Sequence, residues 1–284
     1  MSKAVLYDFF ASAWCQVPKL AIEELGLQNN VELKVVNLLE GENFQPAYLK
    51  VNSHGTIPSL EANGKTYTDS TTCTRALIEM APNAPKKDTH TDHELEKLIH
   101  GVHSEHHDPN VLLLLPVNDE DRSAKASGLP AAFLGGRQKT LDLLVKEDTG
   151  EFETFIKEKQ KFNGTLLSLY TGEADDDTVK KVYSDANAQW KNAGDFIRGE
   201  VTHILRKTPG SYLGGASVPG EADYHLITWL ARIITDAGGK AGSVSGEAFA
   251  ALQARIGPEP IDPVVAGYWD SWTQRASFKK LGVH

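Results

Sequence analysis

Residues 56–70 read TIPSLEANGKTYTDS, and this stretch shows how the amino-terminal part of the chain is built. Pro58 is placed to open a strand, because proline is accepted at the first position of a strand but not inside a central one. Asn63-Gly64 is the strongest hairpin signal in the chain, since both residue types accept the positive φ of a two-residue turn. Residues 65–68 then return antiparallel. The stretch therefore predicts a β-hairpin.

A helix is expected directly after this hairpin. Asp69 and Ser70 precede the run TTCTRALIEM, residues 71–80, and both residue types can cap the free N–H groups of a first helical turn. Pro82 closes the run, because proline cannot continue a helix. The second half of the amino-terminal domain is therefore predicted to be β-β-α.

The residues before this unit predict a parallel pair of strands. Residues 4–9 form a short apolar run that is typical of a buried strand. Apolar residues then recur at helical spacing from Val17 to Leu25, and Gly26 ends the pattern. Residues 31–39, VELKVVNLL, alternate and are rich in β-branched side chains, which indicates a second strand. A β-α-β unit of this kind has a right-handed crossover.

The composition changes after this domain, which we place at residues 1–81. The segment APNAPKKDTHTD is polar and contains prolines, which indicates a linker at residues 82–92. Residues 93–284 have a helical period throughout, with charged amphipathic segments and no strong hairpin signal. LLLLPV, residues 112–117, is too short to cross a membrane and is expected to be a buried helical turn or an extended insert. The predicted fold class is an α/β domain followed by an all-α domain.

The overall composition limits the possible classes of function. The chain has 284 residues, of which 40% are hydrophobic and 24% charged, as in ordinary globular proteins. A formal net charge of −9 disfavours a nucleic-acid partner. No run is long and apolar enough for a membrane span, and the start MSKAVLYDFF lacks a signal-peptide pattern. Cys15 and Cys73 are too few for a disulfide framework, so a reduced, cytoplasmic protein is expected.

Ser12 lies where the first strand gives way to the first helix, in the segment SAWCQVPKL. Its hydroxyl has two possible roles at that place. As a helix cap it would satisfy a free backbone N–H, which contributes about 1 kcal/mol. As a functional group it would face an anion bound at the positive end of the helix. Spacing alone leaves both roles open.

Two further features indicate a ligand near Ser12. The Ile57-Pro58 bond lies where a turn meets a strand and is a candidate cis peptide. A cis proline would expose the N–H and C=O of Ile57 for pairing with an extended peptide, as in strand addition. Asp69 and Ser70 supply a carboxylate, a hydroxyl and free helix N–H groups, which suit the zwitterionic end of a small peptide. The sequence therefore predicts a ligand that is extended, peptidic and anionic.

This arrangement resembles the glutathione transferase superfamily, in which a thioredoxin-like domain precedes an all-helical domain. The segments that carry the resemblance are LYDFFASAWCQVPKLAIEE, NSHGTIPSLEANGKTYTDS and the helix after them. In the serine- and cysteine-type classes the activating residue lies seven positions before a basic residue of the first helix, here Lys19, and this implies Ser12. The resemblance implies a glutathione-binding set made of Thr56, Ile57, cis Pro58, Asp69 and Ser70, with the last two holding the γ-glutamyl group. The motifs SAW, HGTIP and TDS, with the length, look most like the fungal FuA class, which is related to bacterial glutathione-dependent β-etherases.

The sequence departs from the family pattern at three places. The family often has Lys or Gln where this chain has Thr56, and a basic residue where it has Phe44, two positions before Pro46. Both differences remove donors for the glycyl carboxylate, so that end of glutathione must be held otherwise or bound weakly. The Ser/Thr-x-x-Asp helix start of the second domain is replaced by Gly220 and Asp223, and we expect the helix to persist with a weaker cap.

One hydroxyl is enough for the chemistry that the resemblance implies. Lowering the pKa of a thiol from about 8.5 by about 2 units requires about 2.7 kcal/mol. A hydrogen bond to a charged group contributes roughly 1.5–3 kcal/mol, and a helix terminus about 0.3–1 kcal/mol. Ser12 can therefore stabilise a thiolate without a metal or a general base. Tyr7 is a rival as an activating phenol and Cys15 as a partner in a mixed disulfide, although both are also expected in the core.

Aromatic residues flank the proposed thiolate position. Phe10 and Trp14 are candidates for the electrophile pocket, together with Cys15, while Phe9 is expected in the core. The aromatic-rich carboxy-terminal run is also expected to pack rather than to bind. The pocket would be completed by side chains of the helical domain that follow no motif.

Six of the ten histidines fall between residues 90 and 107. His100, His103 and His107 share one helical face with a spacing that metal ligands use. A polar helix face is the favoured interpretation, because the H-E-x-x-H pattern is absent. We therefore expect no metal.

The sequence as a whole predicts a cytoplasmic glutathione transferase of the serine type. Ser12 would stabilise the thiolate of glutathione, the co-substrate, for attack on a hydrophobic aromatic electrophile. The family implies a homodimer, and no nucleic acid or membrane is expected as a partner. Two alternatives stay open: a non-catalytic ligandin for aromatic or polyphenolic compounds, and a glutathione-dependent thiol transferase or β-etherase.

Overall fold

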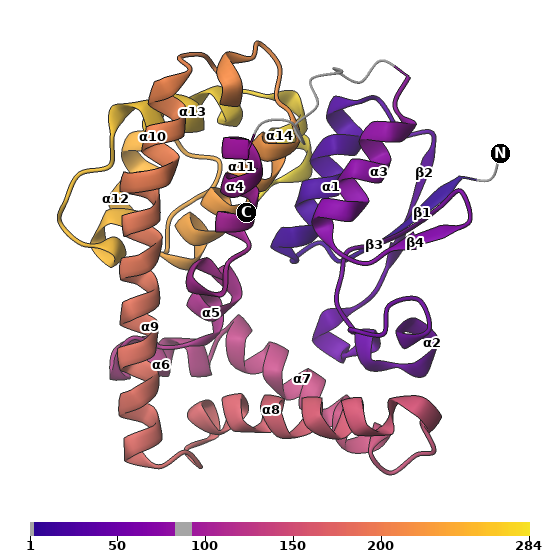
Figure 1. Ribbon diagram of the computed structural model, residues 1–284. Helices are drawn as coiled ribbons and strands as arrows, with labels where there is room; N and C mark the ends of the chain where they lie inside the picture. The colour runs from indigo at the N-terminus through magenta and orange to yellow at the C-terminus, as the bar shows by residue number, and fades with distance from the viewer. Residues whose placement is uncertain (1–2, 83–92) are drawn as a thin grey trace.

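The computed structural model describes residues 3–82 and 93–284, which form a small sheet with its helices and a larger helical region (Figure 1). The first part contains β1 (Ala4–Asp8), α1 (Ala13–Glu24), β2 (Val31–Val35), α2 (Pro46–Leu49), β3 (Ser59–Ala62), β4 (Lys65–Tyr67) and α3 (Ser70–Met80). The second contains α4 (His93–Val102), α5 (Pro109–Leu114), α6 (Asp119–Ala126), α7 (Leu129–Leu144), α8 (Glu153–Thr171), α9 (Asp176–Phe196), α10 (Thr202–Lys207), α11 (Glu221–Asp236), α12 (Ser245–Ile256), α13 (Pro263–Thr273) and α14 (Ala276–Leu281).

The predicted fold class, a thioredoxin-like domain followed by a helical domain, is confirmed. The linker predicted at residues 82–92 falls outside the described residues except for Pro82, so the domain boundaries stay a prediction. No helix in the described ranges is long and apolar enough to cross a membrane.

The sheet has the order β2-β1-β3-β4, with β1 parallel to β2 and antiparallel to β3. Tyr7 pairs with Ser59, and Leu60 pairs with Tyr67. The end of β1, the start of β3 and the end of β4 therefore lie side by side at one end of the sheet. We call this end the sheet edge. This register brings together three segments that are distant in sequence: the loop before α1, the turn before β3 and the start of α3.

The first helix begins at Ala13, one turn before the start that the apolar pattern predicted at Val17. The residue before it, Ser12, has extended backbone angles and marks the boundary. The helix also continues through Pro18, which lacks the N–H that an interior position needs. Burial explains the longer helix, because every residue from Cys15 onward to the middle of α1 is covered by neighbouring elements.

The second strand ends at Val35, four residues before the predicted end of the 31–39 strand. Asn37 then accepts a hydrogen bond from the amide of Leu39 at 3.0 Å and starts a short 3-10 helix, η1 (Leu38–Glu40). An asparagine side chain that bonds its own backbone two residues ahead competes with strand pairing. The alternating pattern of this segment did not reveal that competition.

Helix α1 lies between the sheet and the helical domain. It packs beside α3 on one face of the sheet, and its outer side contacts α11 and α14 (Figure 1). Val17 and Leu20 of α1 belong to the same buried cluster as Trp229 of α11. The two domains thus share one continuous hydrophobic core.

Buried and half-buried ion pairs join the same two domains. Arg275, which precedes α14, binds the carboxylate of Glu24 at the end of α1 through both its Nε and its Nη2, with Nε at 2.7 Å. Arg75 of α3 lies 2.6 Å from Glu221 of α11 and 2.6 Å from Glu96 of α4. Charged pairs with such short contacts fix the angle between the domains as well as their contact.

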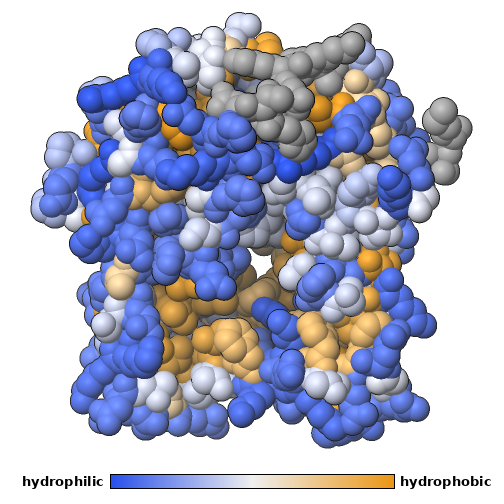
Figure 2. Space-filling model, viewed as in Figure 1, coloured by the Kyte–Doolittle hydropathy of each residue, from blue (hydrophilic) through white to orange (hydrophobic). Residues whose placement is uncertain are grey.

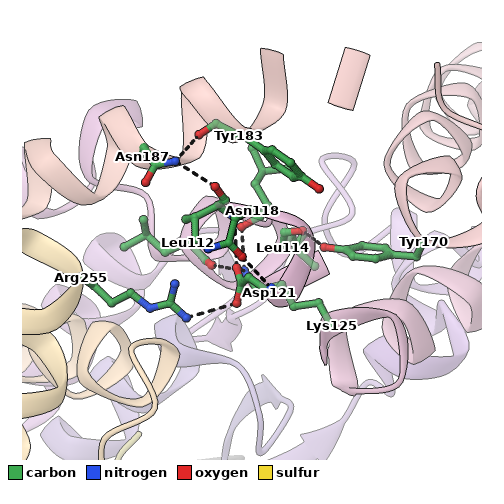
Figure 3. Close-up of polar contacts among 11 residues, drawn as sticks. Leu112, Leu114, Asn118, Asp121, Lys125, Tyr170, Tyr183, Asn187 and Arg255 are labelled. Atoms are coloured by element: carbon green, nitrogen blue, oxygen red, sulfur yellow. Dashed lines mark hydrogen bonds and ion pairs between the residues drawn. The ribbon is translucent and has the colours of Figure 1, made fainter. Parts of the chain in front are cut away.

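The LLLLPV segment contains both of the forms that were expected for it, because α5 ends within it and an extended stretch follows. Lys125 of α6 donates to the carbonyl of Leu112 at 2.9 Å and to that of Leu115 at 2.7 Å (Figure 3). Asp121, one turn earlier, lies 3.4 Å from Lys125 and 3.2 Å from Arg255 of α12. The free carbonyls at the end of α5 are therefore satisfied by a side chain from the next helix.

Helix α11 begins directly after Gly220. The helix expected here therefore persists, although Gly220 replaces the usual Ser or Thr at its start. Glycine has no side-chain oxygen that could accept from a helix N–H. Of the two hydrogen bonds of a capping box, only the one from the Gly220 amide to the Asp223 carboxylate is therefore present. Asp223 accepts hydrogen bonds from the amides of Gly220 at 2.9 Å and Leu213 at 3.0 Å. Burial raises the pKa of the Asp223 carboxyl to about 6, against the opposing effect of these amides.

We expect Asp223→Ala to lower the free energy of unfolding by about 2–4 kcal/mol, because two buried N–H groups would lose their acceptor. Chemical denaturation at pH 7 measures this loss. Asp175→Ala is the matched control, since Asp175 caps α9 by accepting from the Thr178 amide at 2.7 Å in an exposed place, and it should cost less. Equal losses in the two variants would contradict the role given to burial.

Candidate functional site

Ser12 lies at the sheet edge where β1 ends, immediately before α1. Its amide donates to the carbonyl of Phe9 at 3.0 Å, which closes the turn between strand and helix. Its side chain makes no capping hydrogen bond to the helix, although the residue occupies the capping position. The hydroxyl therefore lies next to the first N–H groups of α1 without being engaged by them, and of the two roles predicted for it the functional one fits this geometry better.

Cys15, one turn further, is completely buried. Burial and the carboxylate of Asp8 raise the pKa of its thiol to about 12, and a hydrogen bond with the Ser12 hydroxyl opposes this only in part. Cys15 is therefore a thiol at neutral pH, whereas the thiolate is the nucleophilic form. It packs in a cluster with Tyr7 and Phe9, behind the surface of the site.

Tyr7 also lies inside this cluster, on β1. Its hydroxyl donates to the carboxylate of Glu61 at 2.7 Å. Burial, together with this carboxylate, raises the pKa of Tyr7 to about 12. Since the phenolic hydrogen is already bound to an anion, it is a poor donor for a second one.

The Ile57-Pro58 bond is cis, as predicted. In the part of the chain that the structure describes, neither the amide nor the carbonyl of Ile57 has a hydrogen-bond partner. The preceding carbonyl, that of Thr56, is held by Tyr48 Oη at 2.6 Å and by Asn52 Nδ2 at 2.8 Å. The turn before β3 is therefore fixed on one side while the backbone of Ile57 keeps both of its polar groups unpaired.

Asp69 and Ser70 start α3 at the same sheet edge. Asp69 accepts hydrogen bonds from the amide and the hydroxyl of Thr72, both at 2.8 Å, and thereby caps the helix. Its carboxylate stays exposed, and Ser70 beside it is buried. The sequence predicted a helix cap here, and the structure adds that the carboxylate remains accessible to a ligand.

Thr56 and Phe44, the two positions where the sequence departs from the pattern that the resemblance implied for the glycyl carboxylate, differ in their surroundings. Thr56 accepts a hydrogen bond from Asn52 Nδ2 at 3.2 Å through its hydroxyl. Phe44 ends the short 3-10 helix η2 (Glu42–Phe44) and is buried against side chains of α7 and α8. Neither can supply a positive charge.

The predicted pocket residues lie on different sides of the loop before α1. Phe10 is 65% exposed, with its ring centroid 4.8 Å from that of Phe9. Trp14 is half-buried, and its ring centroid lies 4.1 Å from that of His103, just after α4. Phe10 can therefore contact a ligand directly, and Trp14 forms part of a wall that also contains a histidine.

The histidine wall was not foreseen from sequence. His103 Nε2 lies 2.8 Å from Nδ1 of His225, which is completely buried in α11. Part of the His103 side chain is exposed, but its ring packs between Trp14 and His225, and this desolvation lowers its pKa to about 4. Because 122 positions separate the two histidines, no local pattern could have linked them.

The three histidines that share a helical face do not form a common site. His100 lies 3.4 Å from Glu96, and His103 bonds His225 as described. His107 stacks on Phe196, with ring centroids 4.2 Å apart. Within residues 3–82 and 93–284, no group of three or more potential metal ligands is found.

A further residue that sequence reasoning missed positions the Ser12 loop. Arg232 of α11 is buried and donates a hydrogen bond to the carbonyl of Ala11, the residue before Ser12. Its other terminal nitrogen lies 4.0 Å from the carboxylate of Asp236, one turn further. Burial raises the pKa of Asp236 to about 7, and the positive charge of Arg232 opposes this rise. The helical domain thus holds the loop that carries the candidate hydroxyl.

A hollow lies between the two domains in the middle of the face shown in Figure 2. Hydrophobic residues gather along its lower walls, over the region of α5 and α7 on one side and around α2 on the other. The sheet edge with the three convergent segments faces this space between the domains. The site is therefore a cleft with polar groups at the end of the sheet and apolar residues along both lower walls.

Comparison with known proteins gives a family match for the first part of the chain. Residues 6–85 match the family model described as the glutathione S-transferase N-terminal domain. A zeta-class glutathione S-transferase of Euphorbia esula is 35% identical over 83 residues, which are 29% of this chain and 36% of the relative. Residues 6–85 are therefore similar to the amino-terminal domain of glutathione S-transferases. The aligned region covers little more than a third of that relative's length.

The whole chain has the glutathione S-transferase fold. The β-etherase LigF from Sphingobium sp. strain SYK-6 superposes with a TM-score of 0.59 at 16% identity, over 99% of this chain and 98% of that one. A glutathione transferase homologue from Sulfitobacter with bound glutathione gives a TM-score of 0.55 at 17% identity, over all of both chains. Gtt2 from Saccharomyces cerevisiae gives 0.55 at 16% identity, over 98% and 99%.

The buried histidine of this glutathione S-transferase fold should make its stability sensitive to acid. Burial, with the charges of His103 and Arg75, lowers the pKa of His225 well below 6.5, so the folded state keeps the ring neutral while the unfolded chain takes up a proton. Stability should therefore be complete above about pH 6.5 and fall as the pH drops, by up to about 1.4 kcal/mol per pH unit for this group.

We expect His225→Phe to reduce the slope of unfolding free energy against pH by about that amount between pH 6.5 and 4.5. Thr228→Val is the control, because Thr228 is equally buried three residues further on α11 and does not titrate. Denaturation curves at several pH values give the slopes. An unchanged slope in His225→Phe would mean that this histidine is protonated in the folded state.

Proposed function

We propose that this chain is a glutathione transferase in which the Ser12 hydroxyl stabilises the thiolate of bound glutathione. One observation carries the proposal: Ser12, the unpaired backbone of Ile57 and the helix start at Asp69-Ser70 meet at a single edge of the sheet. They offer a hydroxyl for the sulfur, a backbone segment for the cysteinyl residue, and a carboxylate with helix N–H groups for the γ-glutamyl end. An extended glutathione molecule carries the matching groups in one line: the γ-glutamyl end, the cysteinyl backbone and the sulfur beside it.

The thiolate would be stabilised by a single charge-assisted hydrogen bond. A hydroxyl has one donor and two acceptor sites. Because the Ser12 side chain caps no N–H group of α1, its single hydrogen can be directed at the ligand sulfur. A hydrogen bond of this kind to a charge contributes roughly 1.5–3 kcal/mol, and the positive end of α1 adds about 0.3–1 kcal/mol. Together these suffice for the required shift of about 2 pKa units, or about 2.7 kcal/mol.

The electrophile is proposed to be hydrophobic and aromatic. Phe10 exposes its ring beside the position of the sulfur, and Trp14 with His103 forms the adjacent wall. The thiolate would attack an electrophilic carbon held against these rings and the apolar helical wall. The motifs SAW, HGTIP and TDS support a place near the FuA class, and the fold shared with the β-etherase LigF is compatible with it.

A ligandin role is the second candidate, favoured by the exposed ring of Phe10 and by the apolar walls of the hollow in Figure 2. In that role the cleft would bind aromatic compounds without turnover. A thiol transferase is less well supported, because the burial and high pKa of Cys15 argue against a mixed disulfide.

Three further features belong to the proposal. The protein would act as a homodimer, as the family implies, and in the cytoplasm. Both cysteines, Cys15 and Cys73, are buried thiols, which suits a reducing compartment. The chain would be divided into a glutathione-binding domain at residues 1–81 and an electrophile-binding domain at 93–284, with Thr56 and Pro58 completing the glutathione site.

Ser12→Ala should raise the pKa of bound glutathione by about 1–2 units, from the loss of roughly 1.5–3 kcal/mol. Conjugation of an aromatic test electrophile should fall about 10- to 100-fold near neutral pH, with a smaller change in glutathione affinity. Cys15→Ser is the control and should keep most of the rate. A pH–rate profile of the wild type and both variants measures the effect.

Two results would contradict this assignment in different ways. Full activity in Ser12→Ala with none in Cys15→Ser would make the protein a thiol-transfer enzyme. Binding of aromatic compounds by the wild type without turnover of any electrophile would favour the ligandin.

Asp69→Ala and Ser70→Ala should weaken glutathione binding more than aromatic-ligand binding, because they remove groups that face only the γ-glutamyl end. Calorimetric titration with each ligand in turn gives the comparison. Thermal unfolding serves as the control, since Asp69 also caps α3 and its loss costs about 1 kcal/mol of stability. If both ligands lose affinity equally, the γ-glutamyl end binds elsewhere.

A further inference from the structure

Arg137 of α7 reaches from the helical domain onto the first domain. The guanidinium carbon lies 4.7 Å from the centroid of the Phe44 ring and 4.7 Å from that of Phe133, one turn earlier on α7. Helix α7 is held closely at this place, because Thr140 donates to the carbonyl of Glu40 at 2.6 Å. The guanidinium plane is therefore fixed by two aromatic rings that belong to different domains.

The guanidinium of Arg137 has no polar partner in the described residues. Its Nε is buried without a hydrogen bond, and no ion pair is formed with a carboxylate. Burial alone lowers the pKa of Arg137 to about 10. By contrast, Arg75 and Arg275 each bind carboxylates at the domain interface. A desolvated cation without a partner is costly, and such groups in native proteins are commonly retained for a function.

The guanidinium of Arg137 lies over a segment that is connected to the turn before Ile57. The ring on which it lies, that of Phe44, ends η2 two positions before α2 begins at Pro46. Asn43 donates to the carbonyl of Gly55 at 2.7 Å, which ties this segment to the turn that leads into Ile57. A peptide that pairs with Ile57 and points one end at Asp69 must direct its other end toward this turn.

We infer that Arg137 of α7 binds the glycyl carboxylate of glutathione. The inference rests on the proposed function, because it requires a tripeptide at the sheet edge. The two terminal nitrogens of a guanidinium form a planar pair of donors that matches a carboxylate, and Arg137 as a whole is only partly buried. The two phenylalanine rings hold that plane. The ligand class is a small peptide with a free carboxyl-terminal carboxylate.

The test compares glutathione with its glycyl monoethyl ester, which lacks only this carboxylate charge, by calorimetric titration. Wild type should bind glutathione about 10- to 100-fold more tightly than the ester. Arg137→Met should bind glutathione about 10- to 100-fold more weakly than wild type and bind the ester as wild type does. Arg137→Lys keeps the charge without the paired donors and should fall between them.

Thermal unfolding separates binding from packing. Methionine fills the space between the two rings without a desolvated charge, so Arg137→Met should unfold at the wild-type temperature or above it. Arg206→Met is the matched control, since Arg206 pairs with Asp262 at an exposed place on α10 and should change neither affinity. Arg137→Gln provides a second, polar replacement in case the methionine variant does not fold.

The outcomes distinguish this inference from the proposed function. Failure of the wild type to bind glutathione overturns the proposed function and the inference with it. Wild-type binding of glutathione that is unchanged in Arg137→Met overturns the inference alone. Equal loss of glutathione and ester in Arg137→Met would mean that Arg137 acts only by packing on Phe44, and this also overturns it.

Discussion

The packing of α1 between the sheet and α11 is the constraint on which the rest of the structure depends. Val17 and Leu20 are completely buried, so the helix cannot shift on one side without opening a cavity on the other. Its first residue follows Ser12, and Lys19 near its middle lies 3.2 Å from Asp8 at the end of β1. The position of the candidate hydroxyl is therefore set by the core of both domains and not by its own loop.

The charged contacts across the domain interface add direction to this packing. Hydrophobic contact between α1 and α11 permits a range of crossing angles, whereas Glu24 with Arg275 and Arg75 with Glu221 bring specific atoms together. The same interface contains Arg232, which holds the carbonyl in front of Ser12. The cleft between the domains therefore has a defined shape, because the contacts that join the domains also position the residues on its sheet side.

Local chemistry explains which parts of this arrangement could be predicted from sequence. The Asn63-Gly64 turn, the Asp69 cap and the proline at 58 each act within a few residues, and their patterns predicted the hairpin, the helix start and the cis bond. The first helix was predicted to begin too late, because tertiary burial and not periodicity extends it. The contacts of His103 with His225 and of Arg137 with Phe44 join segments about a hundred residues apart, and nothing in either segment indicates the other.

Two unpaired groups contrast with the matched charges at the domain interface. At the domain interface, Arg75 and Arg275 are matched by carboxylates, as expected where the only requirement is stability. By contrast, the backbone of Ile57 in the turn before β3 and the Nε of Arg137 over Phe44 lack partners among the described residues. Leaving such groups unpaired costs stability, and a chain optimised for folding alone would replace them. Both groups are linked to the segment that leads into Ile57, Arg137 through its contact with Phe44 and that segment through the bond from Asn43 to Gly55, and our proposal of a peptide ligand rests on this placement.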